Sequence, residues 1–176
     1  GYENAASDAP NLAGITYMMF CSGDEKSPFY DLRVRQAVMY AVDWEAMAEG
    51  IYDGLGASTP VFAVPGAWSY DDTLSVYPYD MEKALSLLSE AGYPNGFSTT
   101  ISINEGNAAN LQCAIILQAY LEMVRIKAEI KSLTSADFNA QKAEGVYDLG
   151  IMVNNGASKL DFTANYIRLY SSEGVN

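Results

Sequence analysis

A run of amide and small polar residues follows the last strand-like segment of the sequence, and these side chains are its best candidates for chemistry. Residues 147–153 (YDLGIMV) are typical of a buried strand. In open α/β folds ligands bind beyond the carboxyl ends of strands, and amide side chains both donate and accept hydrogen bonds, which suits peptides, sugars and other small polar solutes. We therefore predict ligand contacts from the loop that follows: Asn154, Asn155, Gly156 and Ser158. A plain turn is the alternative for this loop.

Two further sets of side chains can extend this predicted site. Lys142 precedes the strand and can present a cation to a carboxylate, so we include it among the ligand-binding candidates; a solvated lysine is the alternative. Trp68 and Tyr79, in the irregular tract 58–79, can cover a cleft, although aromatic residues in such a tract more often pack against their own domain. The predicted site thus consists of neutral amides with at most one positive charge.

The residue types that most catalytic and metal sites need are absent. There is no histidine, which excludes Ser-His-Asp and Cys-His catalysis and His-ligated zinc. Cys21 and Cys113 have no metal-ligand spacing, and the sequence leaves open whether they are buried thiols or one disulfide. A glycosidase-like pair of Asp71 or Asp72 with Asp80 is the rival enzyme hypothesis, but a loop and a helix cap fit these residues better. We expect no catalytic residue, no metal and no cofactor, since an Asp-x-Asp-x-Asp-Gly calcium loop is also absent.

The chain is strongly acidic, with a formal net charge of −12 from 22 acidic and 10 basic residues. Much of this imbalance is local, because residues 43–82 contain eight carboxylates and no Lys or Arg. Such a surface repels phosphate backbones and anionic headgroups, which argues against nucleic acid or a membrane surface as a partner. We interpret the acidity as a solubility feature, with cation binding as the less favoured alternative.

The elements that must position these residues follow from hydrophobic periodicity and helix caps. With 176 residues, 49% of them hydrophobic, the chain suits one folded domain, and its longest apolar runs are far too short to span a bilayer. Apolar runs and alternation predict strands over 15–21, 97–103, 124–130 and 147–153. Caps at Asp31, Asp43, Asp80 and Asn107 predict helices over 31–42, 43–54, 80–92 and 107–123, with further helices over 136–143 and 162–170. Because strands and helices alternate, we predict an α/β fold with partly parallel pairing.

Two segments carry a more specific pattern. SPFYDLRVRQAVMYAVD (27–43) resembles the PF-D-RVRQA--YA-D signature of the bacterial extracellular solute-binding proteins of family 5, the dipeptide, oligopeptide and nickel class of ABC importers. YPYDMEKALSLLSEAGYPNGF (77–97) resembles the YDPEKAK-LL-EAGYPNGF segment of the same family, and VRIKAEIK and YDLGIM are similar to two later strands. The likeness covers about residues 12–172 in matching order. Within it, we interpret Arg33 and Arg35 as fold-stabilising partners of carboxylates or carbonyls.

The resemblance implies an α/β fold, a single lobe of the periplasmic-binding-protein-like type II kind with a mixed sheet flanked by helices. Members of the family are much longer than 176 residues and trap their ligand between two lobes. Residues 1–176 are then expected to be one domain, the second (C-terminal) lobe. The partner lobe from the N-terminal part of the same chain, and the return strands of the hinge, are expected to be missing from this sequence.

The function that the resemblance implies is that of the substrate-binding component of an ABC importer. Such a protein captures a peptide or a similar small polar solute between its lobes and delivers it to the transmembrane permease subunits. It is expected to be a monomer and not an enzyme, and to work outside the cytoplasm, in the periplasm or as a lipoprotein at the cell surface. A stand-alone structural or interaction domain, derived from such a lobe and without ligand, is the alternative.

The predicted ligand loop departs from the peptide-binding members of the family. Those members place a Trp in this loop and, shortly after it, an Asp that pairs with the amino terminus of the peptide. Here the Trp position reads as Asn154 and the Asp position falls at Ala157, while Asp161 lies further along the chain. At that position, the chain therefore lacks the carboxylate that would recognise a free amine.

Overall fold

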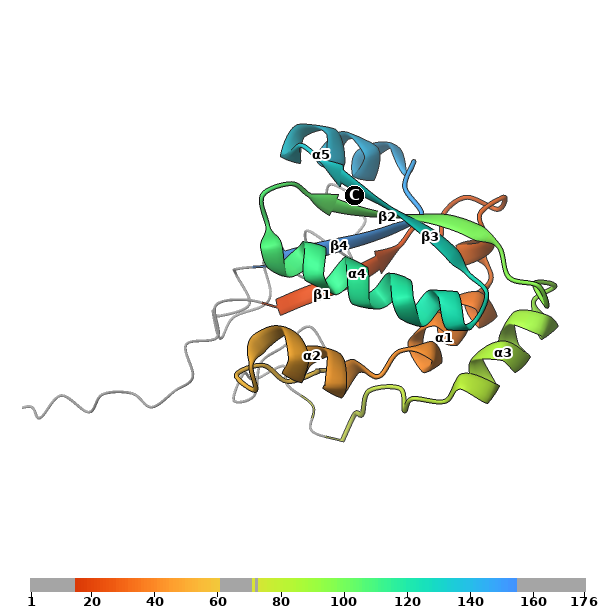
Figure 1. The fold of residues 1–176 in the computed structure, drawn as a ribbon. Helices are drawn as coiled ribbons and strands as arrows, with labels where there is room; N and C mark the ends of the chain where they lie inside the picture. Colours follow the sequence, from red (N-terminus) through yellow and green to blue (C-terminus); the bar gives the residue numbers. More distant parts are fainter. Residues whose placement is uncertain (1–14, 61–70, 72, 155–176) are drawn as a thin grey trace, which may run out of the picture.

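Three parallel strands and one antiparallel strand form a mixed sheet (Figure 1). The computed structural model describes residues 15–60, 71 and 73–154. The strands are β1 (Ile15–Phe20), β2 (Ser98–Asn104), β3 (Lys127–Leu133) and β4 (Leu149–Asn154). Their order across the sheet is β1-β4-β2-β3; β2 pairs in parallel with β3 and β4, and β1 pairs antiparallel to β4. The predicted α/β class with a mixed sheet is confirmed.

Each α-helix begins at a side chain that accepts a hydrogen bond from the backbone of the first turn. The helices are α1 (Leu32–Ala41), α2 (Trp44–Tyr52), α3 (Met81–Glu90), α4 (Ala108–Met123) and α5 (Ser135–Glu144), and a short 3-10 turn, η1 (Pro28–Tyr30), precedes α1. The capping residues are Asp31, Asp43, Asp80, Asn107 and Thr134. The first four caps are confirmed as predicted, because a short acceptor ahead of an amphipathic run is a local signal.

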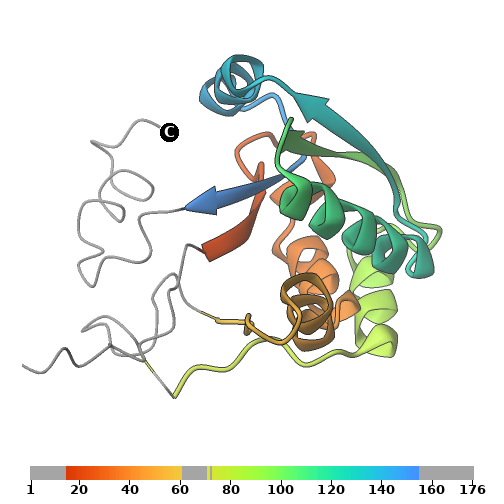
Figure 2. The ribbon, with the colours of Figure 1, turned by 60° about the vertical axis from the view of Figure 1, so that its left-hand side comes forward.

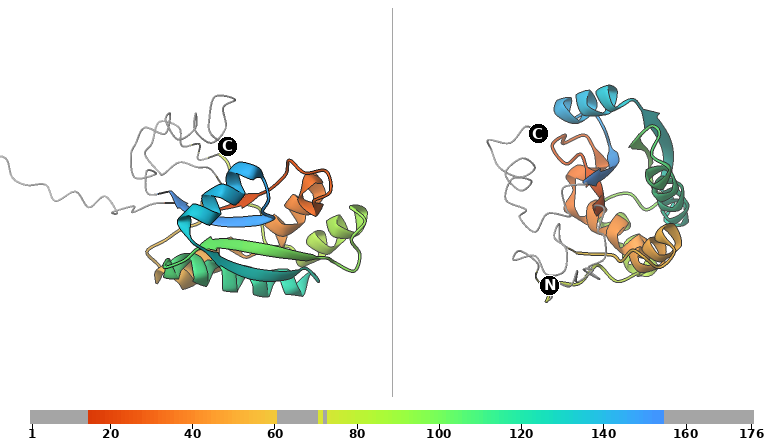
Figure 3. Two further views of the ribbon diagram at one scale, coloured as in Figure 1. Left: turned by 90° about the horizontal axis from the view of Figure 1, so that it is seen from above. Right: turned by 90° about the vertical axis from the view of Figure 1, so that its left-hand side faces the viewer.

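Helices α4 and α5 lie on opposite faces of the sheet, which gives three layers (Figure 3). Alternate residues of a strand point to opposite faces, so Ile101 and Ile103 of β2 share the face that packs against Leu117 of α4. On the other face, Phe138 of α5 is buried so close to Gly150 of β4 that a Cβ atom there would lie 3.2 Å from its ring. Helices α1, α2 and α3 lie on the same side as α4 (Figure 2), and α1 and α2 contact it directly.

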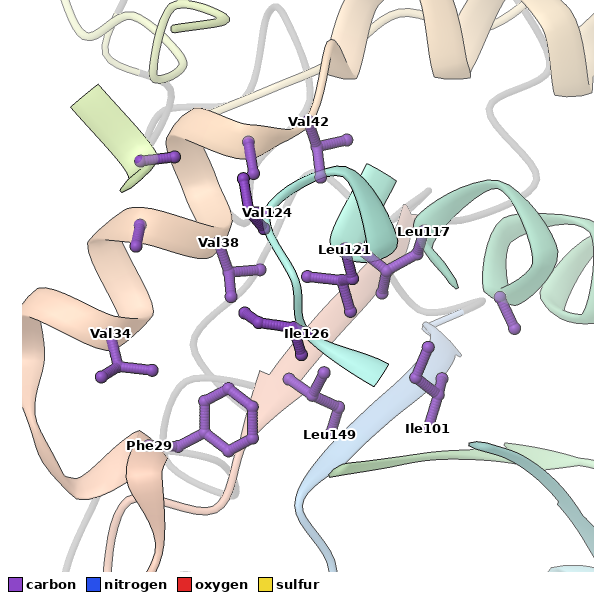
Figure 4. Close-up of a cluster of buried hydrophobic side chains, with 14 of the residues drawn as sticks. Phe29, Val34, Val38, Val42, Ile101, Leu117, Leu121, Val124, Ile126 and Leu149 are labelled. Carbon is purple, nitrogen blue, oxygen red and sulfur yellow. The ribbon is translucent and has the colours of Figure 1, made fainter. Parts of the chain in front are cut away.

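The main core lies between the sheet and the layer that contains α1, α3 and α4 (Figure 4). Side chains from distant parts of the sequence meet there, namely Phe29, Val34, Val38, Val42, Ile101, Leu117, Leu121, Val124, Ile126 and Leu149. None of these ten is more than 1% exposed. Burying each such side chain favours folding by about 1.5–3 kcal/mol, so this cluster fixes the sheet against the helices.

The strand predicted over 124–130 is wrong at its start, because β3 begins only at Lys127. Val124 is the C-cap of α4, and Arg125 has a positive φ of 68°. The N–H of Ile126 then donates to the carbonyl of Leu121, back in the helix. Val124 and Ile126 are therefore buried by a helix-terminating turn and not by the pleat of a strand. The alternation of apolar and charged residues over 124–130 therefore covers the end of α4 and the start of β3, and only its second part reflects a strand.

Several predicted features lie outside the described residues: the helix over 162–170, the loop residues 155–159 and Trp68. Among the described residues, Cys21 and Cys113 are both buried, free thiols. Burial raises the pKa of the Cys113 thiol to about 11, so this cysteine stays protonated and unreactive. None of the described helices combines the length and the apolar character that a membrane span requires.

Candidate functional site

The three parallel strands end at the same side of the sheet, which we call the carboxyl edge (at the left in Figure 1). The last residue of β2 is Asn104, that of β3 is Leu133 and that of β4 is Asn154. Because β1 is antiparallel to β4, its first residue, Ile15, lies at this edge too, opposite Asn154. In open α/β sheets, this is the edge at which ligands bind.

The structure describes only some of the predicted ligand-binding residues. Asn154 lies at the carboxyl edge, as the last residue of β4. Asn155, Gly156 and Ser158 lie outside the described residues, so their contact with a ligand stays a prediction. In the sequence, these three residues closely follow Asn154, the last residue of β4.

Lys142 lies toward the other end of the sheet. It is in the last turn of α5, a helix that starts after β3 at the carboxyl edge and leads back to the amino end of β4. A helix that connects two parallel strands runs antiparallel to them, so its last turn lies near the start of the second strand. The structure therefore does not bring Lys142 together with Asn154.

The carboxyl edge also contains an open depression that the sequence analysis missed. It has a volume of about 220 Å³ and lies between the ends of β2 and β3 and the start of α4. Its lining residues are Ile103, Asn104, Gly106, Asn107, Ala108, Leu111 and Ser132. The signal that could have revealed it is the polar stretch Asn-Glu-Gly-Asn (104–107), which joins a predicted strand to a predicted helix.

The depression is uncharged, since none of its lining residues is acidic or basic. The side-chain oxygen of Asn107 accepts the N–H of Asn110 at 3.0 Å, so Asn107 is committed to the cap of α4. The N–H of Glu105 donates to the carbonyl of Leu133 at 2.8 Å, which ties the loop to β3. This surface suits neutral polar groups beside apolar ones. It is smaller than a complete ligand pocket of about 300–1,000 Å³, so a ligand held here needs a second wall.

The rival carboxylate pair has structural partners. Asp71 accepts hydrogen bonds from the hydroxyl and the backbone N–H of Thr73, which together lower the pKa of Asp71. Asp80 accepts the N–H of Lys83 at 2.8 Å as the N-cap of α3. The loop and cap interpretations of Asp71 and Asp80 are confirmed, while Asp72 lies outside the described residues. In the part of the chain that the structure describes, no cluster of His, Cys, Asp and Glu could hold a metal ion.

The two arginines of the 27–43 segment serve the fold. Arg33 Nη2 lies 2.6 Å from Asp31 Oδ2, and Arg33 Nη1 donates to the carbonyl of Glu90 at the end of α3. The hydrogen bond from the Arg33 side chain lowers the pKa of Asp31. Arg35 Nη1 donates to the backbone carbonyl of Phe29 at 2.6 Å. The predicted pairing with a carboxylate and with carbonyls is confirmed.

Residues 3–176, nearly the whole chain, match the model of the family described as bacterial extracellular solute-binding proteins, family 5 Middle. The chain is similar to heme-binding protein A of Haemophilus influenzae, with 38% identity over 141 residues that cover 78% of this chain and 25% of that protein. It is also similar to the dipeptide-binding protein of Escherichia coli, with 30% identity over 159 residues that cover 86% of this chain and 30% of that protein. Among solved structures, HbpA2 of Haemophilus parasuis has a TM-score of 0.81 and 27% identity, over 93% of this chain and 32% of that one. The chain thus spans about a quarter to a third of the length of these relatives.

Proposed function

This chain belongs to the bacterial extracellular solute-binding proteins of family 5, and we propose from that premise that it forms one wall of a solute-binding cleft. The observation that carries the proposal is the carboxyl edge, where three parallel strands end beside an open, uncharged depression of about 220 Å³. A single open wall leaves a solute half in water and binds it weakly. A second lobe that closes over this wall completes the cleft and excludes the water.

The length of the relatives supports the two-lobed part of this proposal. Because the chain covers 25% of one relative and 30% of the other, most of each relative lies outside the matched region. We assign to the whole protein the role of a monomeric substrate-binding component that works outside the cytoplasm and delivers its solute to the permease subunits of an ABC importer. The word extracellular in the family description supports that location.

The proposed solute is a peptide or a similar small polar molecule. The two similar proteins are named for different ligands, heme and dipeptides, so the chemistry of the wall must narrow the choice. The described wall offers the amide of Asn104 and the hydroxyl of Ser132, and Asn154 leads into the predicted ligand loop. Amides and hydroxyls pair well with the N–H and C=O groups of a peptide bond.

Replacing both Asn154 and Asn155 by Ala in the full-length protein tests the proposed wall. Each hydrogen bond lost from a closed cleft costs about 0.5–1.5 kcal/mol. The double variant should therefore bind roughly tenfold or more weakly, since 1.4 kcal/mol corresponds to one decade in affinity. Calorimetry with the tightest-binding member of a di- and tripeptide panel measures this loss. The melting temperature should stay nearly unchanged, because a polar loop contributes little to the core.

Asn139→Ala is the matched control, because Asn139 is an exposed amide on α5 and is not part of the predicted ligand loop. It should change neither affinity nor melting temperature. If the 154–158 loop is only a turn, the double variant lowers the melting temperature and leaves the affinity intact, and the site then lies elsewhere on the lobe. A full-length protein that binds no peptide, sugar or metal complex at all would favour the stand-alone interaction domain.

A further inference from the structure

Strand β3 lies at one end of the sheet, and among the described residues no strand pairs with its outer side. The N–H of Lys127 donates to the carbonyl of Phe97, next to the start of β2. At the other end of β3, the carbonyl of Leu133 accepts the N–H of Glu105. In a parallel pair, the residues between such partners point their N–H and C=O groups the other way. The even-numbered residues of β3 therefore direct these groups away from β2.

These outward-facing backbone groups belong to Ala128, Ile130 and Ser132. The carbonyl of Ala128 fits this direction, since it accepts a hydrogen bond of 2.6 Å from the side chain of Gln118 on α4. Its second lone pair remains for another donor. A row of open N–H and C=O groups at the edge of a sheet is a template for a further strand.

The charged side chains of β3 determine which strand can pair with it. Lys127, Glu129 and Lys131 are exposed and, as alternate residues, share one face of the strand. None of the three forms an ion pair with another described residue. Charged side chains usually keep an edge strand from pairing. Here their signs alternate, so a strand with the same sequence can pair with them in a defined register.

Two copies of β3 related by a two-fold axis pair antiparallel, and outward-facing residues must then lie opposite outward-facing residues. With the axis at Ile130, the midpoint of the strand, all seven residues of β3 pair. Each Glu129 then lies opposite Lys131 of the other copy, and each Lys127 lies opposite Leu133. Charges of opposite sign that face each other stabilise an antiparallel pair.

The neighbouring registers bring like charges together. With the axis at Glu129, this residue lies opposite itself and Lys127 lies opposite Lys131. With the axis at Lys131, that lysine lies opposite itself. Like charges directly opposite each other destabilise the pair. An axis at Ala128 joins opposite charges too, but it pairs only residues 127–129 of the strand.

Apolar side chains of α4 lie beside this edge. Leu111 and Ile115, one turn apart, are 44% and 51% exposed. Ile115 lines an open depression of about 480 Å³ together with Lys127 and Ala128 of β3. Although the whole chain has a net charge of −12, α4 and β3 together contain two acidic and two basic residues. A second copy therefore meets less repulsion at this neutral surface than elsewhere on an acidic chain.

We propose that two copies of this chain associate through β3, with Ile130 at the two-fold axis, and so join their sheets into one. The contact is small, so the dimer forms only at high concentration, and the monomer assigned to the whole protein is its dilute form. Each copy keeps its own proposed solute-binding wall, because the pairing uses backbone groups on the outer side of β3.

Sedimentation velocity of the 176-residue chain tests the dimer from about 1 µM to about 1 mM, at about 0.15 M salt to screen the net charge. The parent chain should change from monomer to dimer over this range. Lys131→Glu and Glu129→Lys each place like charges opposite each other twice in the dimer, so each should weaken association about tenfold or more. An equimolar mixture of the two variants should regain the dimer, because every facing pair again has opposite signs.

Lys127→Glu is the matched control, since it makes the same change of charge on the same face of β3 but opposite Leu133. It should leave association nearly unchanged. All three substituted positions are exposed, so the melting temperature of a dilute sample should stay close to that of the parent chain. Equal losses from Lys127→Glu and Lys131→Glu, or a mixture that stays monomeric, overturn the proposal.

Hydrogen exchange in the parent chain tests the same contact without any substitution. The N–H of Ile130 faces outward, so it should exchange fast in a dilute sample and become protected as the concentration rises. The N–H of Glu129 faces β2 and should be protected at every concentration, which makes it the internal control. Protection of Ile130 that does not depend on concentration, or a parent chain that sediments as a monomer throughout, overturns the proposal.

Discussion

At the scale of single residues, the parts of the sequence that most resemble the family are structural. Arg33 joins Asp31 at the start of α1 to the Glu90 carbonyl at the end of α3, and so ties two helices together. Asp31 has two roles, because its carboxylate also accepts the N–H of Arg33 at 2.8 Å as the cap of α1. These contacts hold the helical layer together, whereas the proposed ligand contacts lie at the carboxyl edge.

Substituting Asp31 separates these two roles. Asp31→Ala removes the cap and should destabilise the chain by about 1 kcal/mol, measured by urea unfolding. Asp31→Asn keeps a capping oxygen and loses the charge, so near neutral pH it should cost less than Asp31→Ala. Equal losses in the two variants would show that the ion pair, and not the cap, matters at this position.

The same carboxylate makes stability depend on pH in a defined window. Its pKa in the folded chain is lowered from the usual 3.8 by the hydrogen bond from Arg33. A lowered pKa in the folded state means that the stabilising contribution is complete well above pH 3.8 and is lost as the pH falls below it. The difference in unfolding free energy between the parent chain and Asp31→Asn should therefore shrink as the pH falls through this window.

At the scale of elements, the turn between α3 and β2 depends on a glycine that lies against another backbone. Gly96 has a φ of +71°, and a Cβ atom there would overlap the carbonyl group of Arg125 in the turn between α4 and β3. Arg125 Nη1 also donates to the carbonyl of Pro94 at 2.6 Å. The two turns thus fit together and set where β2 and β3 begin side by side, with Ser98 opposite Lys127.

Gly92 provides the matched control for this contact. It too has a positive φ, of 93°, but no atom lies within 4 Å of a Cβ built there. Gly92→Ala should cost only the left-handed backbone strain, about 1–2 kcal/mol. Gly96→Ala adds a backbone collision and should lower the melting temperature clearly further, as measured by circular dichroism. Equal effects would mean that the two turns move apart at little cost.

The sequence predicted the helices of the described residues well, and it predicted only some of the residues that lie at the carboxyl edge. Caps at Asp80 and Asn107 are local signals, so they were predictable without the fold. The start of β3 was not, because the burial of Val124 depends on how α4 ends. Asn104 was missed and Lys142 was grouped with Asn154 for the same reason: which residues share an edge depends on strand order and direction, which no local pattern encodes.

At the scale of the whole molecule, one continuous core joins the sheet to α1, α3 and α4. We therefore expect the 176-residue chain to fold alone and to melt in a single cooperative transition. Far-UV circular dichroism and tyrosine fluorescence should give coincident curves. Separate transitions, or a gradual loss of signal, would show that the core needs residues from outside this sequence.

The isolated chain should bind peptides only weakly. A two-lobed protein gains its affinity from contacts on both walls and from the loss of water between them, and we propose that this chain supplies only one wall. Calorimetry on the chain alone should therefore find no peptide with a dissociation constant as tight as micromolar, which corresponds to about −8 kcal/mol. Micromolar binding by the chain alone would show that its own surface is a complete site.

The pairing of β1 with β4 determines when the chain can complete its sheet. β1 is the first strand of the described chain and β4 the last, so the apolar segment ITYMMF gains its partner only after everything between them has been synthesised. Closing so long a loop costs entropy before the contacts between the strands form, which slows folding. During synthesis, the uncharged strand β1 therefore stays without this partner until the residues of β4 have been added. The location outside the cytoplasm that we propose requires export before folding, and this delay would keep β1 unpaired and open to chaperones until then.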